Sequence, residues 1–214
     1  LKNIKKYNVP SKKLHYFPNW AEEDFNNAEN TTHAPEIRKD KDDFVILFAG
    51  NIGEAQKLDD LLEAVSLTEQ NGKIKWFIIG KGRDWSRINS IIKQKNLESI
   101  KLLGQFPLSR MPQFYAAADA LFVCLKPDPL FSITIPGKLQ TYMLSGKPII
   151  GMLDGEGANL INKAKAGLTC KAGDSKSLAK KAILMANMSM QERSKLGNSG
   201  KMYATKHFDR STII

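Results

Sequence analysis

Long apolar runs and cysteines are both scarce in this sequence. No apolar run approaches the roughly 20 residues that a helix needs to cross a bilayer, and no signal-peptide pattern opens the chain. Cys124 and Cys170, the two cysteines, lie in apolar segments and form no metal-ligand cluster. We therefore expect a soluble globular protein in which both cysteines are buried free thiols in a reducing compartment.

The usual signatures of nucleic-acid-binding proteins are also missing. The sequence has no zinc-finger spacing, no aromatic RNA-binding motif and no zipper heptad. Its formal net charge is nevertheless +10, from 32 basic against 22 acidic residues, and the lysines are spread along the chain. Such a charge indicates an anionic partner. We expect no nucleic acid, and favour a cytoplasmic enzyme, peripheral on the inner face of the cytoplasmic membrane, that acts on phosphate-bearing, membrane-linked molecules.

The domain organisation follows from a change of pattern near residue 43. Residues 1–42 are irregular, with the end of a helix at Leu1–Tyr7, a short strand at Lys13–Phe17 and a polar surface loop at Glu22–Asp43. We predict that 1–42 is a connecting segment with first elements and that 43–214 is one domain. Because the chain starts at Leu1 without a methionine, we expect it to be part of a longer protein.

From residue 43 onward, short apolar runs alternate with amphipathic segments. We predict strands at Phe44–Phe48, Ile74–Ile79, Ile100–Leu103, Ala120–Leu125, Pro148–Met152 and, at the edge, Leu168–Cys170. We predict helices around 58–65 and 85–92 and at Ser109–Ala118, Gly137–Leu144, Asp174–Met188 and Met190–Lys206, with Ser109, Asp174 and Ser189 as N-caps. This alternation predicts an α/β fold with a Rossmann-like, doubly wound parallel sheet.

Ligands of such a sheet bind at the carboxyl ends of the strands, so the loops that follow the apolar runs matter most. The first loop holds Gly50, Gly53 and Lys57 before a helix, a composition that suits a phosphate. It is neither a Walker loop nor a dinucleotide fingerprint. An ordinary glycine-bearing turn with a solvated lysine explains the loop equally well.

Two further groups of loops follow the same logic. Gly80-Lys81-Gly82-Arg83 and Gln105-Phe106-Pro107 follow the second and third strands and suit a planar base, although tight turns are an alternative. Pro136, Gly137 and Lys138 mark a helix start that suits an anion, again with an ordinary helix start as the alternative. Nearby hydrogen-bonding side chains for a ribose or sugar are Thr134, Gln140 and Thr141.

In combination and order, these motifs resemble the C-terminal domain of glycosyltransferase family 4, the group 1 class of retaining sugar transferases. The resemblance covers nearly the whole chain. It rests on Phe48-Ala-Gly-Asn-Ile-Gly53, Phe77-Ile-Ile-Gly-Lys-Gly82, Gly104-Gln-Phe-Pro107, Asp119-Ala-Leu-Phe-Val123, Pro136-Gly-Lys138 with Tyr142-Met143, and Ser145-Gly-Lys-Pro-Ile-Ile150. Phe17-Pro-Asn-Trp20 resembles the segment that connects the two domains of these enzymes.

The resemblance implies the donor-binding half of a bacterial GT-B enzyme whose acceptor domain is absent from this chain. It implies a UDP-sugar as donor and no divalent metal or other cofactor. Implied diphosphate contacts are Gly50, Asn51, Gly53, Lys57, Pro136, Gly137 and Lys138. Implied base contacts are Gly80, Lys81, Gly82, Arg83, Gln105, Phe106 and Pro107, and implied ribose or sugar contacts are Thr134, Gln140 and Thr141.

The sequence departs from the family pattern in two places. Two glutamates that the family usually carries eight positions apart fall at Ile133 and Thr141, and the usual arginine of the first loop is Asn51. A branch acting in O-antigen, lipopolysaccharide and capsule synthesis, with Pro-x-Lys-x-x-x-Tyr-Met at this helix, resembles the sequence better. Lys138 then replaces arginine at the phosphate, and Thr141 or Gln140 contacts the ribose.

The leading hypothesis is transfer of a sugar, with the N-acetylhexosamine type as the candidate, from a UDP-sugar to a lipid-linked acceptor with retention. This chain alone should bind donor but turn over poorly, because the acceptor side belongs to the missing domain. No catalytic residue is assigned, and His15, His33 and His207 lie outside the candidate loops. The alternatives are a non-catalytic nucleotide-sugar-binding module and a sugar-nucleotide epimerase of GT-B form.

Overall fold

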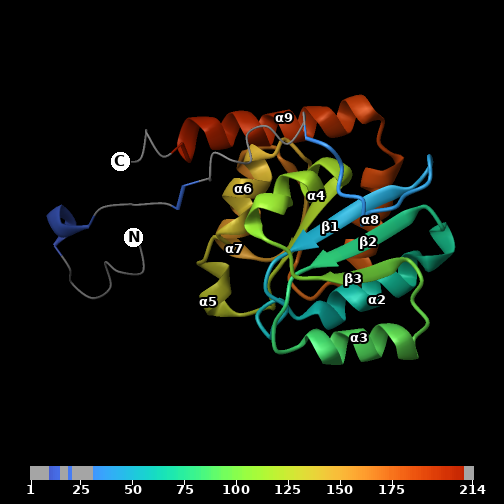
Figure 1. Ribbon diagram of the computed structural model, residues 1–214. Helices are drawn as coiled ribbons and strands as arrows, with labels where there is room; N and C mark the ends of the chain where they lie inside the picture. Colours follow the sequence, from blue (N-terminus) through green and yellow to red (C-terminus); the bar gives the residue numbers. More distant parts are fainter. Residues whose placement is uncertain (1–9, 15–18, 21–30, 210–214) are drawn as a thin grey trace.

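The computed structural model describes residues 10–14, 19, 20 and 31–209, and its centre is a six-stranded sheet (Figure 1). Every pair of neighbouring strands is parallel, in the order β3-β2-β1-β4-β5-β6. The doubly wound parallel sheet is therefore confirmed, and each strand begins and ends within one residue of its prediction. The strands are β1 (Phe44–Ala49), β2 (Ile74–Ile79), β3 (Ile100–Gly104), β4 (Ala120–Cys124), β5 (Ile149–Met152) and β6 (Gly167–Cys170).

Helices cover both faces of the sheet (Figure 1). On one face lie α2 (Leu58–Thr68), α3 (Trp85–Gln94) and α8 (Ser175–Asn187), and α2 packs on α8. On the other lie α4 (Met111–Ala117), α6 (Lys138–Leu144), α7 (Gly155–Lys163) and α9 (Met190–His207), and α9 packs along α6. The remaining elements are α5 (Pro129–Ser132) and the 3-10 helices η1 (Ser11–Lys13), η4 (Glu69–Asn71) and η5 (Leu108–Arg110).

The two cores meet at the central strands because these strands are buried on both faces. In β1, Val45 and Leu47 join the core under α4 and α6, whereas Ile46 and Phe48 join the core under α2 and α8. Every residue of β1 is buried. A strand covered on both faces needs an uninterrupted apolar run, which is why the sequence pattern located it.

Some predictions about local structure were wrong. Ser109 does not cap a helix, since it lies inside η5, and α4 begins only at Met111. No helix was predicted between Ala120–Leu125 and Gly137–Leu144, but α5 lies there, and its N-cap Asp128 accepts a hydrogen bond from the Leu130 amide at 2.7 Å. No helix was predicted where α7 lies.

The predicted strand at Lys13–Phe17 is wrong at its start, because Lys13 belongs to η1. Its residues 15–17 lie outside the described part of the chain, as do the predicted helix end at Leu1–Tyr7 and residues 22–30 of the predicted surface loop.

The two predicted caps near the C-terminus are confirmed. Asp174 accepts a hydrogen bond from the Ser177 amide at 2.9 Å, and Ser189 and Glu192 form a reciprocal capping box. Both cysteines are free, but only Cys124 is fully buried, and burial raises the pKa of its thiol to about 12. Among the described residues, no helix combines the length and apolar character that a bilayer crossing requires.

Candidate functional site

Three loops meet at the carboxyl edge of the sheet because the hydrogen-bonded ladder continues past the strand ends. The Gly50 amide donates to Ile79 O at 2.9 Å, and the Ile52 amide donates to Lys81 O at 2.9 Å. The Gly80 amide likewise donates to Gly104 O at 2.7 Å. The loops after β1, β2 and β3 are therefore held side by side as an extension of the sheet.

This close approach of the loops explains two of the glycines. Gly80 has a φ of 140°, and a Cβ on it would lie 1.8 Å from Gly50 O. A Cβ on Gly82 would lie 2.1 Å from Ile52 O. No side chain fits at either position while the neighbouring loop keeps its path.

A hollow of about 580 Å³ lies over these loops. Five of the seven predicted base-binding residues line it, namely Gly80, Lys81, Gly82, Gln105 and Phe106, together with Gly50 and Asn51 of the predicted diphosphate loop. Its other lining residues are Ile79, Leu108 and Met111. The prediction that these separate loops share one site is therefore supported by their geometry.

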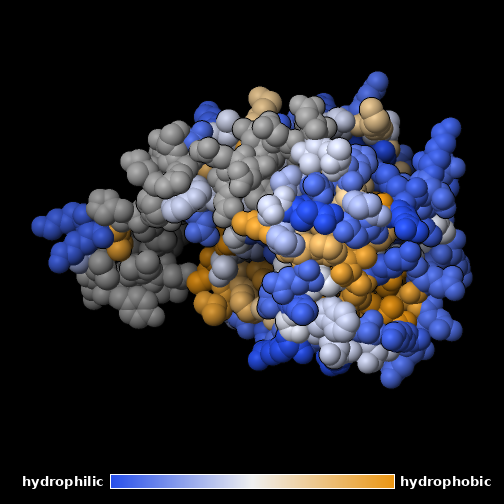
Figure 2. Space-filling model, in the orientation of Figure 1, coloured by the Kyte–Doolittle hydropathy of each residue, from blue (hydrophilic) through white to orange (hydrophobic). Residues whose placement is uncertain are grey.

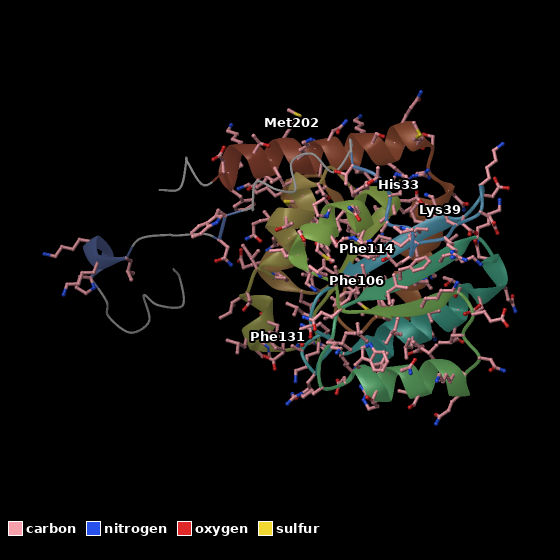
Figure 3. The ribbon with its side chains drawn as sticks, in the orientation of Figure 1. His33, Lys39, Phe106, Phe114, Phe131 and Met202 are labelled. Atoms are coloured by element: carbon pink, nitrogen blue, oxygen red, sulfur yellow. The ribbon has the colours of Figure 1, made fainter. Side chains whose placement is uncertain are left out.

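The wall of the hollow at Phe106 is fixed by an aromatic pair and a cation. Phe106 and Phe114 lie side by side with ring centroids 4.7 Å apart (Figure 3). The Arg110 guanidinium lies 5.7 Å from the Phe106 centroid and 5.4 Å from the Phe114 centroid, and it pairs with Glu36 at 2.9 Å. Phe106 thus presents a supported ring, on which a planar base can stack.

Lys138 lies at the switch point of the sheet, where β1 and β4 are neighbours and the winding direction reverses. Its Nζ lies 3.9 Å from the centroid of the Phe48 ring and directly over Gly50, whose absent Cβ would be 2.3 Å away. The residue as a whole is half-buried, but Nζ itself is buried and has no hydrogen-bond partner among the described residues.

Burial lowers the pKa of the Lys138 ammonium to about 8. The neighbouring Cys124 thiol is neutral near pH 8, because burial raises its own pKa to about 12. A buried ammonium without a partner is costly, so it is expected to take an anion when one is present.

Tyr142 fixes α6, and hence Lys138, to the end of β1. Its hydroxyl donates to Ala49 O at 3.1 Å and accepts from the Ala49 amide at 2.9 Å. The ring is fully buried and stacks edge-on against Tyr115 with centroids 5.5 Å apart. Tyr142 was noticed in the sequence only as part of a motif, and its role as a positioning residue appears in the structure.

We predict that Tyr142→Phe lowers the free energy of unfolding by about 2 kcal/mol, because the buried amide and carbonyl of Ala49 lose their shared partner. Urea denaturation measures this loss. Tyr203→Phe is the matched control, since it removes a hydroxyl that has no hydrogen bond in the described structure, and it should change stability little. Equal losses in both variants would contradict the assignment.

Lys57 is placed differently from the prediction of a free phosphate contact. It adopts a left-handed conformation, with φ of 43°, as the N-cap residue of α2. Its Nζ lies 3.1 Å from Asp60 Oδ1, while the side chain is 46% exposed. Lys57 can therefore reach a ligand only by sharing its charge with Asp60, whose Oδ2 is buried without a partner.

Arg83 does not line the hollow. Its guanidinium lies 2.8 Å from Glu54 Oε2, and Glu54 Oε1 accepts a hydrogen bond from Lys126 at 2.6 Å. The Lys126 ammonium and the Arg83 guanidinium lower the pKa of the Glu54 carboxyl. Glu54 thus links the loops after β1, β2 and β4, a role that was not predicted from the sequence.

The polar residues around α6 are not equivalent. Gln140 is 2% exposed, and its side-chain nitrogen, in the orientation that satisfies it, donates to Gly137 O at 2.8 Å and Pro136 O at 3.3 Å. It therefore positions the loop before α6 and has no surface for a ribose. The Thr134 hydroxyl is exposed and donates to Leu130 O at 2.8 Å, and Thr141 is half-buried.

Three predicted contacts lie beside the site rather than in its wall. Pro136 precedes the N-cap residue Gly137 and so lies just before α6. Gly53 is buried under Asn51, and Pro107 precedes η5 and does not line the hollow. Among the described residues, no group of three or more His, Cys, Asp or Glu side chains is placed to hold a metal ion.

The match to known protein families agrees with this geometry. The family model described as glycosyl transferases group 1 matches residues 29–202. The chain belongs to this family. This chain is 26% identical over 138 residues to the probable glycosyltransferase WbjE of Pseudomonas aeruginosa. The aligned region covers 64% of this chain and 34% of the relative.

A second relative is WcaI of Escherichia coli K12, described as a colanic acid biosynthesis glycosyl transferase. It is 25% identical over 147 residues, which cover 64% of this chain and 34% of the relative. The resemblance to a branch that builds surface polysaccharides is thereby confirmed. The glycosyltransferase chain spans about a third of the length of these two curated relatives.

Solved structures confirm the GT-B fold class. S. aureus TarM, solved with UDP and other ligands, matches with a TM-score of 0.77 at 15% identity over 98% of this chain and 39% of that chain. Anabaena HepE, solved with UDP, matches with a TM-score of 0.68 at 21% identity over 80% of this chain and 46% of that chain. The C-terminal domain of Francisella tularensis LpcC matches with a TM-score of 0.66 at 18% identity over 89% and 96% of the two chains.

Proposed function

We propose that this chain is the donor-binding half of a retaining glycosyltransferase and that UDP-sugar binds across the carboxyl edge of β1, β2 and β4. The observation that carries the proposal is the buried, unpartnered Nζ of Lys138 over Gly50. Lys138 adjoins the hollow that Gly50, Gln105 and Phe106 line. A cation beside a partly apolar hollow suits a diphosphate that is joined to a base.

In this proposal the uracil ring occupies the hollow and stacks on Phe106, while the Lys138 ammonium binds the diphosphate. Backbone groups near Gly80 and Lys81 contact the edge of the base. The amides of the loop after β1 and the ammonium of Lys57 complete the phosphate contacts. HepE and TarM were solved with UDP, which supports uracil as the base.

The chemistry that follows is departure of UDP from the anomeric carbon of the sugar, with retention of configuration. Negative charge grows on the leaving diphosphate, and a desolvated ammonium stabilises such charge more strongly than an exposed one. We propose that Lys138 and Lys57 supply this stabilisation and that no divalent metal is required.

The donor sugar, in this proposal, is of the N-acetylhexosamine type and lies near Thr141, and Thr134 stands at the outer rim. The acceptor is a lipid-linked glycan held by a further domain, so this chain alone should bind donor without transferring it. Ile133 and Thr141 stand where the family usually has glutamates, and Ile133 is 51% exposed. Contacts to ribose or sugar therefore come from neutral groups here.

Titration calorimetry of the chain with UDP, GDP and ADP, with EDTA and then with magnesium, tests the proposal. UDP should bind most tightly, and its affinity should not depend on magnesium. Equal affinity for all three nucleotides would remove the base assignment to the hollow. No binding of any nucleotide would overturn the donor-binding function for this chain.

The affinity for UDP should fall as the pH rises through 8. Lys138 of the free protein loses its proton above a pKa of about 8, and the diphosphate binds the charged form, so binding takes up a proton. Between pH 7 and about 8.5 the affinity should fall about fourfold, because bound Lys138 stays charged while free Lys138 loses its proton. Lys138→Met should flatten this interval, which ends below the pH at which uracil N3 loses its own proton.

A further inference from the structure

The net positive charge of the chain comes largely from its last helices and the strand between them. From the start of α7 at Gly155 to the end of α9 at His207, ten lysine and arginine residues stand against three acidic ones. This quarter of the chain therefore carries +7 of the total formal charge of +10. The rest of the chain is close to balanced, because its 22 basic residues stand against 19 acidic ones.

Exposed lysines gather around the free edge of β6, the last strand of the sheet. We define the β6-edge surface by its five exposed lysines, Lys163, Lys165, Lys171, Lys176 and Lys180. They come from the end of α7, the turns on either side of β6, and α8. Both helices pack directly on β6, so these lysines border the same edge.

Charges on this surface are close enough to act together. Hydrogen bonds from Ser177 lower the pKa of Asp174, and Lys180 and Lys171 lower it further, which places both ammonium groups near one carboxylate. Among the described residues, the five lysines of the surface form no ion pair, whereas Lys39, Lys57 and Lys126 each pair with a carboxylate. The surface therefore keeps its charge available for a partner.

The exposed side of α8 adds an apolar side chain to this charge. Lys176, Lys180 and Leu184 recur every four residues and share one face of the helix, and Leu184 is 49% exposed. Lysines that surround an exposed leucine are typical of a surface that lies on lipid head groups and inserts one apolar side chain.

We propose that the β6-edge surface binds an anionic lipid membrane. Its lysines are exposed and spread along one edge of the domain, an arrangement that complements an extended negative surface. Attraction of several lysines to anionic lipid is additive within a Debye length, so five suffice for reversible recruitment. The surface contains none of the residues that line the nucleotide hollow, so membrane binding and UDP binding are separate properties.

Co-sedimentation with vesicles tests the proposal. The 214-residue chain should bind vesicles of phosphatidylglycerol and phosphatidylcholine, and this binding should weaken as the salt concentration rises. It should not bind vesicles of pure phosphatidylcholine. The triple variant Lys171→Glu, Lys176→Glu, Lys180→Glu should lose about tenfold or more in the bound-to-free ratio. Its UDP affinity, measured in parallel, should stay unchanged and shows that the variant is folded.

The matched control reverses three exposed lysines at the opposite edge of the sheet: Lys73→Glu, Lys93→Glu and Lys95→Glu. Both variants have the same net charge, so the control should bind anionic vesicles nearly as well as the unmodified chain. Equal loss in both variants would show an effect of net charge alone and overturn the proposal. Binding to a DNA duplex but to no vesicle would reassign the surface to another polyanion and overturn it too.

Discussion

Lys138→Met should weaken UDP binding about 100-fold while making the unliganded protein more stable. In the proposed complex, the ammonium pairs with the diphosphate in a desolvated place, and loss of such a charge pair typically costs about 2 to 5 kcal/mol, or roughly 30- to several-thousand-fold in affinity. In the free protein the same ammonium is buried over Phe48 with no partner. Methionine keeps the length of the side chain without the charge.

The gain in stability follows from the sign of the pKa shift. Because the pKa of Lys138 falls to about 8 in the folded protein, the unfolded chain binds more protons between pH 8 and the ordinary lysine pKa near 10.4. The free-energy penalty for the buried charge is complete below pH 8 and disappears as the pH rises from 8 to the ordinary lysine pKa near 10.4. At pH 7 the variant should gain on the order of 3 kcal/mol in the free energy of unfolding.

Thermal unfolding at pH 7 and UDP titration measure the two effects. Lys126→Met is the matched control, because Lys126 is also partly buried but has Glu54 as a partner at 2.6 Å. That control should not become more stable. If Lys138→Met binds UDP as tightly as the unmodified chain, the diphosphate lies elsewhere.

Gly80→Ala should have the second large effect, in this case on folding and binding together. The new Cβ would lie 1.8 Å from Gly50 O, a backbone atom, and alanine would have to adopt a φ of 140°. The loops after β1 and β2 must separate to admit it. We expect a loss of about 3 kcal/mol or more in stability, together with loss of measurable UDP binding.

Gly72→Ala separates the backbone cost from the clash. Gly72 also has a left-handed φ, of 68°, but a Cβ there meets no atom within 4 Å. This control should cost about 1 kcal/mol and leave UDP affinity unchanged. Similar losses in stability in both variants would mean that the two loops do not press against each other.

The sequence located what depends on local pattern. The continuous apolar run of β1 and the run of β2, which only Lys75 interrupts, placed both strands within one residue, because burial on both faces requires such runs. Helix α7 was missed because Gly155 and Gly157, in its first turn, resemble a loop. These glycines are needed for packing instead, since a Cβ on Gly155 would lie 1.8 Å from Ser132 O.

Tertiary contacts explain what the sequence could not show about the site. The three loops were grouped correctly because parallel strands bring their carboxyl ends together. Whether a polar side chain faces the ligand or the protein depends on the path of the chain around it. Gln140 therefore proved to be a buried support for the loop before α6, and Phe48 proved to lie under the ammonium of Lys138.

An apolar surface lies over α5 (Figure 2). Leu130 is 63% exposed and Ile133 51% exposed there, beyond the region where the loops are bound to the sheet.

The hydrogen bonds that extend the ladder past β1, β2 and β3 have a consequence for the thermodynamics of binding. Gly50, Ile52 and Gly80 have already lost their backbone freedom when the domain folds, so a nucleotide does not have to order them. Binding of a nucleotide therefore carries a smaller entropy cost, because the loops that it contacts are already ordered in the free protein. Under the proposed function, base preference depends on a few exposed side chains of the hollow, such as Gln105 and Leu108, which can change without altering the fold.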